Sequence, residues 1–364
     1  MTEQQEISDE KYFFLPTQVI EFEDYIILRR GVTHLKVSGD TAFEIIKVIM
    51  ILGSEDGATI QEIVNYFDGS YRESIEHIAE QLTGKRFLVT ESEKKIALET
   101  EGRGKELSNF YWVLNFGEQQ LEKISATRLH VIGINHISLR ICELLKKSGF
   151  GNIELIDYPL LRNQFYFNDN GPDASKLPGD AQCLIVSYSK WLENMEDAEF
   201  DMLITTSDFG GTYYMRDFNK LCVENSVPFF AVALQNMKAY VGPMVIPGFT
   251  ACFECFLQRQ NANLEDFETL RSIELSDYEG QSITASHPAM SFMAADVAMM
   301  EIFKFYSSAT PSQNTGRIIE INMLKTEMKN RLVLKIPRCH VCGNIHKVSA
   351  TSVFDNAFMP THSE

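Results

Sequence analysis

Long apolar runs and a basic N-terminal segment are both missing from this sequence. A membrane helix needs roughly 18 consecutive apolar residues, whereas the apolar segment Ala42–Leu52 is interrupted by Glu44 and Lys47. The first ten residues, MTEQQEISDE, lack the positive charge with which secretory signals begin. We therefore expect a cytoplasmic protein that does not enter a membrane.

An excess of basic residues is also missing. The 364 residues contain 33 lysines and arginines against 50 aspartates and glutamates, which gives a formal net charge of −17. Because nucleic-acid binding requires cationic side chains that neutralise phosphates, this balance argues against DNA or RNA as the main partner. It suits a basic partner or a basic peptide. The length favours two domains, and 45% apolar residues suffice for their cores.

The N-terminal region has the pattern of a small winged helix-turn-helix domain. Residues 1–11 are polar and are expected to form a disordered tail. Short β-like runs occur between residues 18 and 37, three helical patterns begin near residues 40, 59 and 70, and residues 86–90 read as a closing strand. Thr59 and Glu62 have the spacing of a capping box. We predict one domain over residues 12–90.

DNA is the ordinary ligand of a winged helix, but the third helix argues against it. Residues 71–83 carry Glu73, Glu76 and Glu80 against the single cation Arg72. A recognition helix has to neutralise phosphates, and this one would repel them. A peptide that adds a strand at the edge formed by residues 33–37 meets no such repulsion.

The remainder reads as an α/β domain over residues 109–364, after a charged linker at residues 91–108. Alternating helical and strand patterns predict a largely parallel sheet that is covered on both faces. Its opening unit, residues 129–157, has the strand, turn, helix and strand of a Rossmann-like nucleotide fold.

The phosphate-binding turn of this unit has lost most of its glycines. Where such folds carry G-x-G-x-x-G, only Gly133 remains, and Asn135 and Ser138 stand at the second and third positions. The second glycine lets the backbone approach the pyrophosphate, and the third allows close helix packing. The fold can therefore persist without its nucleotide.

Two acids follow strands of this sheet and could still serve a nucleotide. Asp157 ends the second strand, where a carboxylate commonly binds a ribose hydroxyl, or it is simply an acid in a turn. Asp208 follows the strand that contains residues 202–204 and could coordinate magnesium or cap the next turn. With Gly133 they define a degenerate nucleotide site, at which ATP and magnesium are not expected to bind.

The seven cysteines fall into two groups. Cys142, Cys183 and Cys222 lie singly in apolar surroundings and are expected to be buried core residues. The other four form two C-x-x-C pairs, which are Cys252 with Cys255 and Cys339 with Cys342. This spacing lets two thiolates hold one tetrahedral zinc ion, and four thiolates leave no position for water.

We therefore predict a structural zinc site that ties a distant segment of the chain to the sheet domain. Two alternatives compete with it. One is a thioredoxin-like redox pair, although neither pair lies in a thioredoxin pattern, and the other is a set of free thiols.

Together these residues resemble the ThiF-like, ubiquitin-activating-type adenylating superfamily. The resemblance runs from about Leu121 to Gly343 and rests most strongly on residues 242–255, GPMVIPGFTACFEC. It implies zinc on the two cysteine pairs, an arginine segment at residues 161–165 and a magnesium-binding acid at Asp208. The arginine segment departs from the family pattern, and Phe209 replaces the usual asparagine.

Residues 14–90 resemble the leader-peptide recognition module of ribosomal peptide modification systems. With a degraded ThiF-like domain, this resembles the leader-peptide-binding partner of YcaO-family cyclodehydratases, which form thiazoles and oxazoles in bacteriocin-like peptides. The resemblance implies a non-catalytic subunit that presents a precursor peptide and activates the YcaO enzyme, and a homodimer. It places the leader groove at residues 33–37 and 71–83. The groove residues would be Thr33, Leu35, Val37, Ile78 and Gln81.

Two other functions remain open from the sequence. A ThiF-like enzyme that adenylates a precursor peptide is favoured by Asp157 and Asp208 and disfavoured by the lost glycines. A DNA-binding regulator with a zinc-stabilised sensor domain is disfavoured by the acidic third helix.

Overall fold

The computed structural model describes residues 10–30, 33–54, 56–67, 71–91, 93–94, 118–194, 199–235, 237–262, 287–307 and 315–343. The chain divides into two compact units, Met1–Leu121 and Glu122–Glu364. The first nine residues of the predicted tail and residues 95–108 of the predicted linker lie outside the described residues. No helix among the described residues has both the length and the apolar character of a membrane span.

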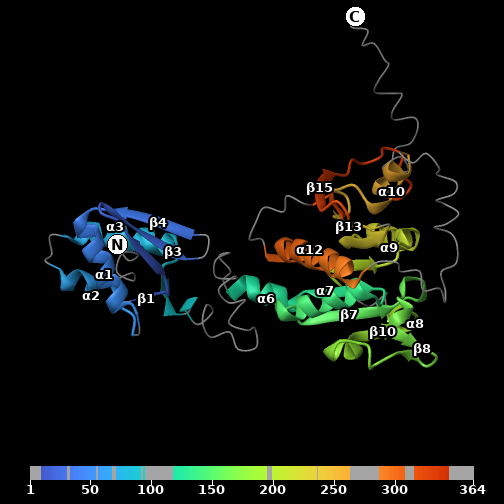
Figure 1. Ribbon diagram of the computed structural model, residues 1–364, viewed down its shortest axis with the longest axis horizontal. Helices are drawn as coiled ribbons and strands as arrows, with labels where there is room; N and C mark the ends of the chain where they lie inside the picture. Colours follow the sequence, from blue (N-terminus) through green and yellow to red (C-terminus); the bar gives the residue numbers. More distant parts are fainter. Residues whose placement is uncertain are drawn as a thin grey trace, which may run out of the picture. The chain divides into compact units, whose positions relative to one another are not determined.

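Between residues 10 and 91, the described part of the first unit combines two small sheets with three helices (Figure 1). Its elements are β1 (Tyr12–Phe14), β2 (Gln18–Glu21), β3 (Tyr25–Arg30), β4 (Thr33–Ser38), α1 (Asp40–Leu52), α2 (Ile60–Tyr66), α3 (Arg72–Gly84) and β5 (Leu88–Thr90). Strands β2, β3 and β4 form an antiparallel sheet in that order, and β1 pairs with β5. The sequence patterns did not indicate β1.

One apolar cluster holds the first unit together. Ile45, Ile49, Ile75 and Leu82 of its helices are fully buried with Leu28 of β3. Helix α2 begins where the sequence predicts, because the Thr59 hydroxyl accepts from the Glu62 amide and the Glu62 carboxylate accepts from the Thr59 amide. The winged helix-turn-helix assignment of this unit stays a prediction.

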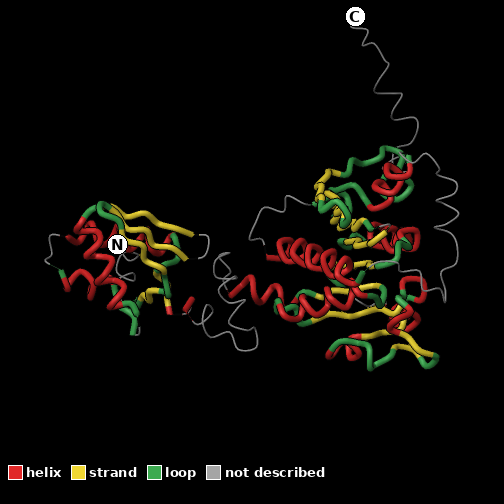
Figure 2. Tube along the Cα trace, in the orientation of Figure 1, coloured by secondary structure: helices red, strands yellow, loops and turns green. Residues whose placement is uncertain are grey.

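The second unit contains one eight-stranded sheet flanked by helices (Figure 2). Helix α6 (Glu118–Ala126) spans the boundary between the two units. The other described helices of the second unit are α7 (His136–Lys147), α8 (Tyr188–Asn194), α9 (Met215–Glu224), α10 (Phe253–Asn261) and α12 (Pro288–Ser307). Its sheet strands are β6 (Arg128–Ile132), β7 (Asn152–Asp157), β10 (Ile185–Ser187), β11 (Met202–Ser207), β12 (Phe229–Gln235), β13 (Lys238–Val245), β14 (Arg317–Asn322) and β15 (Glu327–Leu332). The short strands β8 (Phe167–Asn168) and β9 (Gly171–Pro172) pair separately.

The sheet is parallel in one half and antiparallel in the other. The strand order is β10-β7-β6-β11-β12-β13-β14-β15, and the pairs from β10 to β12 are parallel whereas those from β12 to β15 are antiparallel. The predicted Rossmann-like α/β sheet is therefore present, but its antiparallel half was not predicted. Residues 181–184 form part of a 3₁₀ turn before β10.

The helices cover both faces of this sheet. The crossover from β6 to β7 runs toward one edge and the crossover from β11 to β12 toward the other. Right-handed crossovers therefore place α7 and α9 on opposite faces. Helix α12 packs on α7, and α10 packs on α9 and β13. These connections bring the carboxyl ends of β6, β7 and β11 together at one edge, which is the usual position of a ligand site.

Candidate functional site

The three residues predicted for the nucleotide site do meet at this edge. Gly133 follows β6, Asp157 ends β7 and Asp208 follows β11, and these three strands are neighbours in the sheet. Their role as a degenerate nucleotide site stays a prediction. Side chains of the protein, described below, bind the groups that would otherwise contact a nucleotide.

Gly133 is required by packing within the protein. Its φ is +97°, in the region that favours glycine, and a Cβ atom there would lie 2.8 Å from the Thr206 carbonyl oxygen and 2.9 Å from that of Leu161. The retained glycine is therefore explained without a bound phosphate.

The Asn135 side chain closes the turn. It is fully buried, and its Oδ1 accepts from the Ile137 amide at 3.0 Å and the Ser138 amide at 3.1 Å. Its Nδ2 donates to the carbonyl and the hydroxyl oxygens of Thr206, both at 3.0 Å. The Ser138 hydroxyl accepts from the Asn135 amide, which completes a capping box on α7. Asn135 itself is extended, with a φ of −155°, so the turn makes no use of the left-handed conformation that asparagine tolerates.

The Asp208 carboxylate lies at the N-terminus of α7, where this fold usually holds a phosphate. Its Oδ2 accepts from the His136 amide at 3.0 Å and from Asn163 Nδ2 at 2.8 Å, and the residue is 1% exposed. Burial raises the pKa of this carboxyl above its usual range, and the hydrogen bonds from Asn163 and His136 offset only part of that rise. A carboxylate thus takes the place of an anionic ligand.

The second predicted acid is also engaged within the protein. Asp157 accepts a bidentate pair from Arg162, with distances of 2.6 and 2.8 Å, and the guanidinium lies 4.6 Å from the centre of the Phe167 ring. The acid expected at the ribose and the arginine expected at the phosphate therefore neutralise each other.

ATP with magnesium does not fit these residues. The first three amides of α7, from His136 to Ser138, already donate to Asp208 or Asn135, and the Leu139 amide donates to the Asn135 carbonyl. A triphosphate at this turn would displace a buried side chain and meet the Asp208 carboxylate. Both changes are unfavourable, because they break satisfied hydrogen bonds and bring like charges together.

Replacement of Asn135 by alanine should destabilise the second unit by about 2 kcal/mol, since the variant loses a helix cap and leaves buried amides of α7 without acceptors. Urea unfolding monitored by tryptophan fluorescence measures the change. Asn168→Ala is the matched control, because Asn168 caps an exposed turn. An Asn135→Ala variant as stable as this control would contradict the packing described above.

The four paired cysteines converge on one point. Their sulfur atoms all lie within 4.8 Å of one another, and three of the separations are 3.8 Å (Cys252 to Cys255), 3.6 Å (Cys252 to Cys339) and 3.5 Å (Cys255 to Cys342). Thiolates about 2.3 Å from a tetrahedral zinc ion lie about 3.8 Å apart. The cluster has the size of a metal site, and hydrogen bonds from Cys252 and Cys255 lower the pKa of Cys342 to about 7.

Local structure holds the two cysteine pairs in place. Cys252 is the N-cap residue of α10, and Cys255 lies in its first turn. Gly343 closes the second pair by donating its amide to the Cys339 carbonyl, and a Cβ atom on Gly343 would lie 2.4 Å from that oxygen. Arg259 of α10 donates to the carbonyls of Leu334 and Lys335, which joins the segment after β15 to the helix.

An ion pair with a buried carboxylate lies beside the cysteine cluster. Glu254, between the first two cysteines, is fully buried, and Arg216 of α9 binds it with two nitrogens, one of them at 2.5 Å. Gln258 donates to the same carboxylate at 2.8 Å. No sequence motif indicated this pair, because its two residues lie on helices that meet only in the folded sheet domain.

The lone cysteines follow their prediction where they are described. Cys142 and Cys222 are buried in the sheet domain, whereas the side chain of Cys183 lies outside the described residues.

The predicted peptide-groove residues lie on β4 and α3 of the first unit. Thr33, Leu35 and Val37 share one face of β4, which is an edge strand of its sheet, and all three are half-buried. Leu35, Val37 and Ile78 pack against the same apolar cluster. Gln81 is exposed. Their role in peptide binding stays a prediction.

His136 was not singled out as a site residue. Its Nδ1 lies 2.5 Å from the Tyr166 hydroxyl, and its ring contacts those of Phe165 and Phe292. Only the fold brings these residues together, so sequence spacing gave no signal for them.

The fold and the strand-end site define a class of protein, a Rossmann-like α/β protein related to nucleotide-binding enzymes. Residues 182–341 match the ThiF family. SUMO-activating enzyme subunit 2 of Dictyostelium discoideum is 27% identical over 164 residues, which are 38% of this chain and 23% of the relative. The chain thus carries a ThiF-like domain, which confirms the resemblance seen in its motifs.

Two solved structures are similar over nearly the whole chain. E. coli MccB, with MccA, has a TM-score of 0.66 at 15% identity and covers 92% of this chain and 100% of its own. The heterocyclase TruD has a TM-score of 0.60 at 16% identity and covers 98% of this chain but 45% of its own. Likeness at these identities establishes the fold. The chain spans about a quarter of the SUMO-activating subunit and less than half of TruD.

Proposed function

We propose that this protein binds the leader of a ribosomally made precursor peptide and presents it to a YcaO-family cyclodehydratase that forms azoline rings. The observation that carries the proposal is the filled turn at α7. Asn135 and Asp208 take up the amides that would hold a triphosphate, so catalysis with ATP would fall to the partner enzyme.

The similar structures support a role in peptide modification. One MccB structure is described as the microcin C7 biosynthetic enzyme in complex with N-formylated MccA, and TruD is described as a heterocyclase. The present chain corresponds to less than half of TruD.

The first unit would bind the leader. The half-buried face of β4 offers apolar side chains beside an open strand edge, so a leader could add as a further strand while its side chains contact Leu35, Val37 and Ile78. In this proposal the unit is a winged helix adapted to peptides. The four cysteines would hold one structural zinc ion, and the protein would act as a cytoplasmic homodimer.

Serine at Leu35 should weaken leader binding at least about tenfold, because the variant removes a contact worth about 1.5–3 kcal/mol when buried. His34→Ser on the exposed face of the same strand is the matched control. Ile78→Ser and His77→Ser form the equivalent pair on α3. Fluorescence anisotropy with a labelled precursor peptide from the same gene neighbourhood measures the affinities. If all four variants bind the precursor peptide with equal affinity, β4 and α3 do not form the leader-binding groove.

Reconstitution tests the function as a whole. The precursor peptide, the neighbouring YcaO protein, ATP and this protein should together yield peptide that has lost one water molecule per ring, as measured by mass spectrometry. Omission of this protein should abolish or strongly slow the reaction. Ring formation that proceeds equally well without it would contradict the proposal.

A second function, adenylation of a precursor peptide, has two observations in its favour. Asp157 and Asp208 remain at the strand ends, and MccB, which has the same fold over 92% of this chain, has been solved with ATP. This alternative requires peptide-dependent release of pyrophosphate by this protein alone. The reconstitution without the YcaO protein tests for that release.

A further inference from the structure

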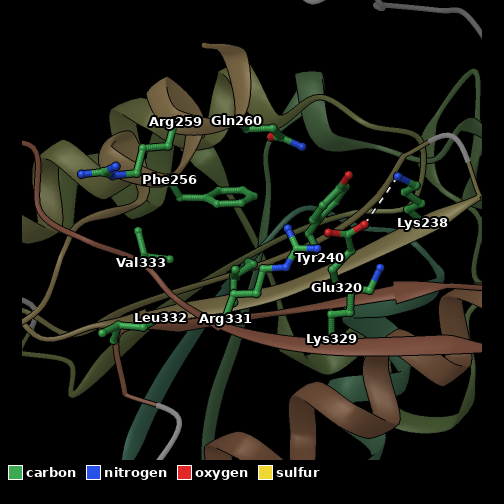
Figure 3. A pocket seen from close by; sticks show the side chains of 11 residues that line it. Lys238, Tyr240, Phe256, Arg259, Gln260, Glu320, Lys329, Arg331, Leu332 and Val333 are labelled. Carbon is green, nitrogen blue, oxygen red and sulfur yellow. Dashed lines mark ion pairs between the residues drawn. The ribbon is translucent and has the colours of Figure 1, made fainter. Parts of the chain in front are cut away.

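A cavity of about 520 Å³ lies on the antiparallel half of the sheet, away from the α7 turn (Figure 3). Its size is within the range of peptide side-chain and small-molecule sites. Strands β13, β14 and β15 form its floor, and α10 forms one wall.

The strand register builds this floor. Tyr240 pairs with Glu320, which in turn pairs with Lys329, so their side chains form one row across the three strands. Two residues along, Ile318 pairs with Arg331 on the same face. The ring of Phe256 from α10 lies against Tyr240, with ring centres 5.9 Å apart. The centre of the cavity is therefore aromatic and apolar.

The rim of the cavity is cationic. Lys238, Arg259, Lys329 and Arg331 line it together with a single carboxylate, that of Glu320. Lys238 pairs with Glu320 at 3.4 Å, the dashed line in Figure 3. Lys329 pairs with the exposed Glu327 at 2.9 Å. Within the described part of the chain, no carboxylate forms an ion pair with Arg331. This excess of cations stands out in a chain whose net charge is −17.

We propose that this cavity binds an acidic peptide segment of a partner polypeptide. An aliphatic or aromatic side chain of the segment would lie against the rings of Tyr240 and Phe256, and its flanking carboxylates would lie against Arg331 and Lys329. Charge complementarity selects this occupant, because a basic or neutral segment would leave the cationic rim without counter-charge. The aromatic floor requires an apolar residue beside the acids, which separates such a segment from a simple anion.

The test uses the full chain and three labelled probe peptides in fluorescence anisotropy. The first has the sequence Asp-Glu-Leu-Asp-Phe, the second replaces its acids with lysine, and the third replaces its apolar residues with glycine. We expect saturable binding of the first peptide that weakens with salt, with binding of the others at least about tenfold weaker. Arg331→Glu should weaken the first peptide at least about tenfold.

Lys325→Glu is the matched control, because it makes the same kind of charge reversal in the turn of the same hairpin, outside the cavity lining. It should leave affinity within about twofold. The proposal is overturned by absence of saturable binding of the first peptide, by equal binding of the lysine peptide, or by an equal loss in Lys325→Glu. Equal binding of the glycine peptide, or displacement of the first peptide by inorganic phosphate, would show that the cavity recognises anions alone. Either result would also overturn the proposal.

Discussion

Cys252→Ser is expected to leave the sheet domain largely unfolded at room temperature and free of zinc. Cys252 is fully buried and shares its cluster with three other sulfurs, of which only that of Cys342 belongs to a half-buried residue. The metal would join α10 to the segment after β15 across residues 256–338. A structural zinc ion contributes roughly 10–16 kcal/mol in small metal-dependent domains. Loss of even half of that is comparable with the whole stability of a typical domain.

Cys222→Ser is the control for this experiment. Cys222 is also a buried thiol of the sheet domain, but it lies on α9 and outside the cluster. The control should retain one zinc ion per chain by elemental analysis and a thermal midpoint close to that of the original protein. A metal-free preparation of the original protein with an unchanged thermal midpoint would contradict a structural metal.

Arg216→Met is expected to destabilise the second unit by about 3–5 kcal/mol, since it leaves the buried Glu254 carboxylate without its counter-charge. Glu254 is fully buried, and apart from Arg216 only the neutral Gln258 amide is seen to bind it among the described side chains. Because Glu254 lies between Cys252 and Cys255, zinc content should fall together with stability. Urea unfolding and elemental analysis measure the two effects.

Two further variants make this second prediction specific. Replacing both Arg216 and Glu254 by methionine should recover most of the loss, because an apolar pair of similar volume avoids an uncompensated buried charge. Lys220→Met on the same helix removes only an exposed pair with Glu224 at 3.9 Å and should change stability by less than about 1 kcal/mol. An Arg216→Met variant no less stable than Lys220→Met would show that the pair does not support the metal cluster.

The predictions that succeeded from sequence rest on short spacings. The C-x-x-C pairs and the Thr59 capping box each depend on residues within a few positions of one another. Such patterns reflect local backbone geometry, so they can be recognised in the sequence without knowledge of the fold.

The features that escaped prediction depend on contacts between distant residues. Residues 327–332 carry only two apolar side chains, Met328 and Leu332, and both are exposed, so only their pairing with β14 identifies them as a strand. The structural role of Asn135 likewise depends on its hydrogen bond to Thr206, which is 71 positions away in the sequence. The sequence could show that a glycine had been lost, but only the structure shows that the replacing side chain fills the turn.

Isothermal titration of the full chain with ATP and magnesium tests most directly whether this turn is closed to nucleotides. The hydrogen bonds of Asn135 and Asp208 predict no saturable heat up to about 1 mM ATP, at low as well as physiological salt. Saturable binding in the micromolar range, abolished by Asp208→Ala, would contradict the account and favour an adenylating enzyme.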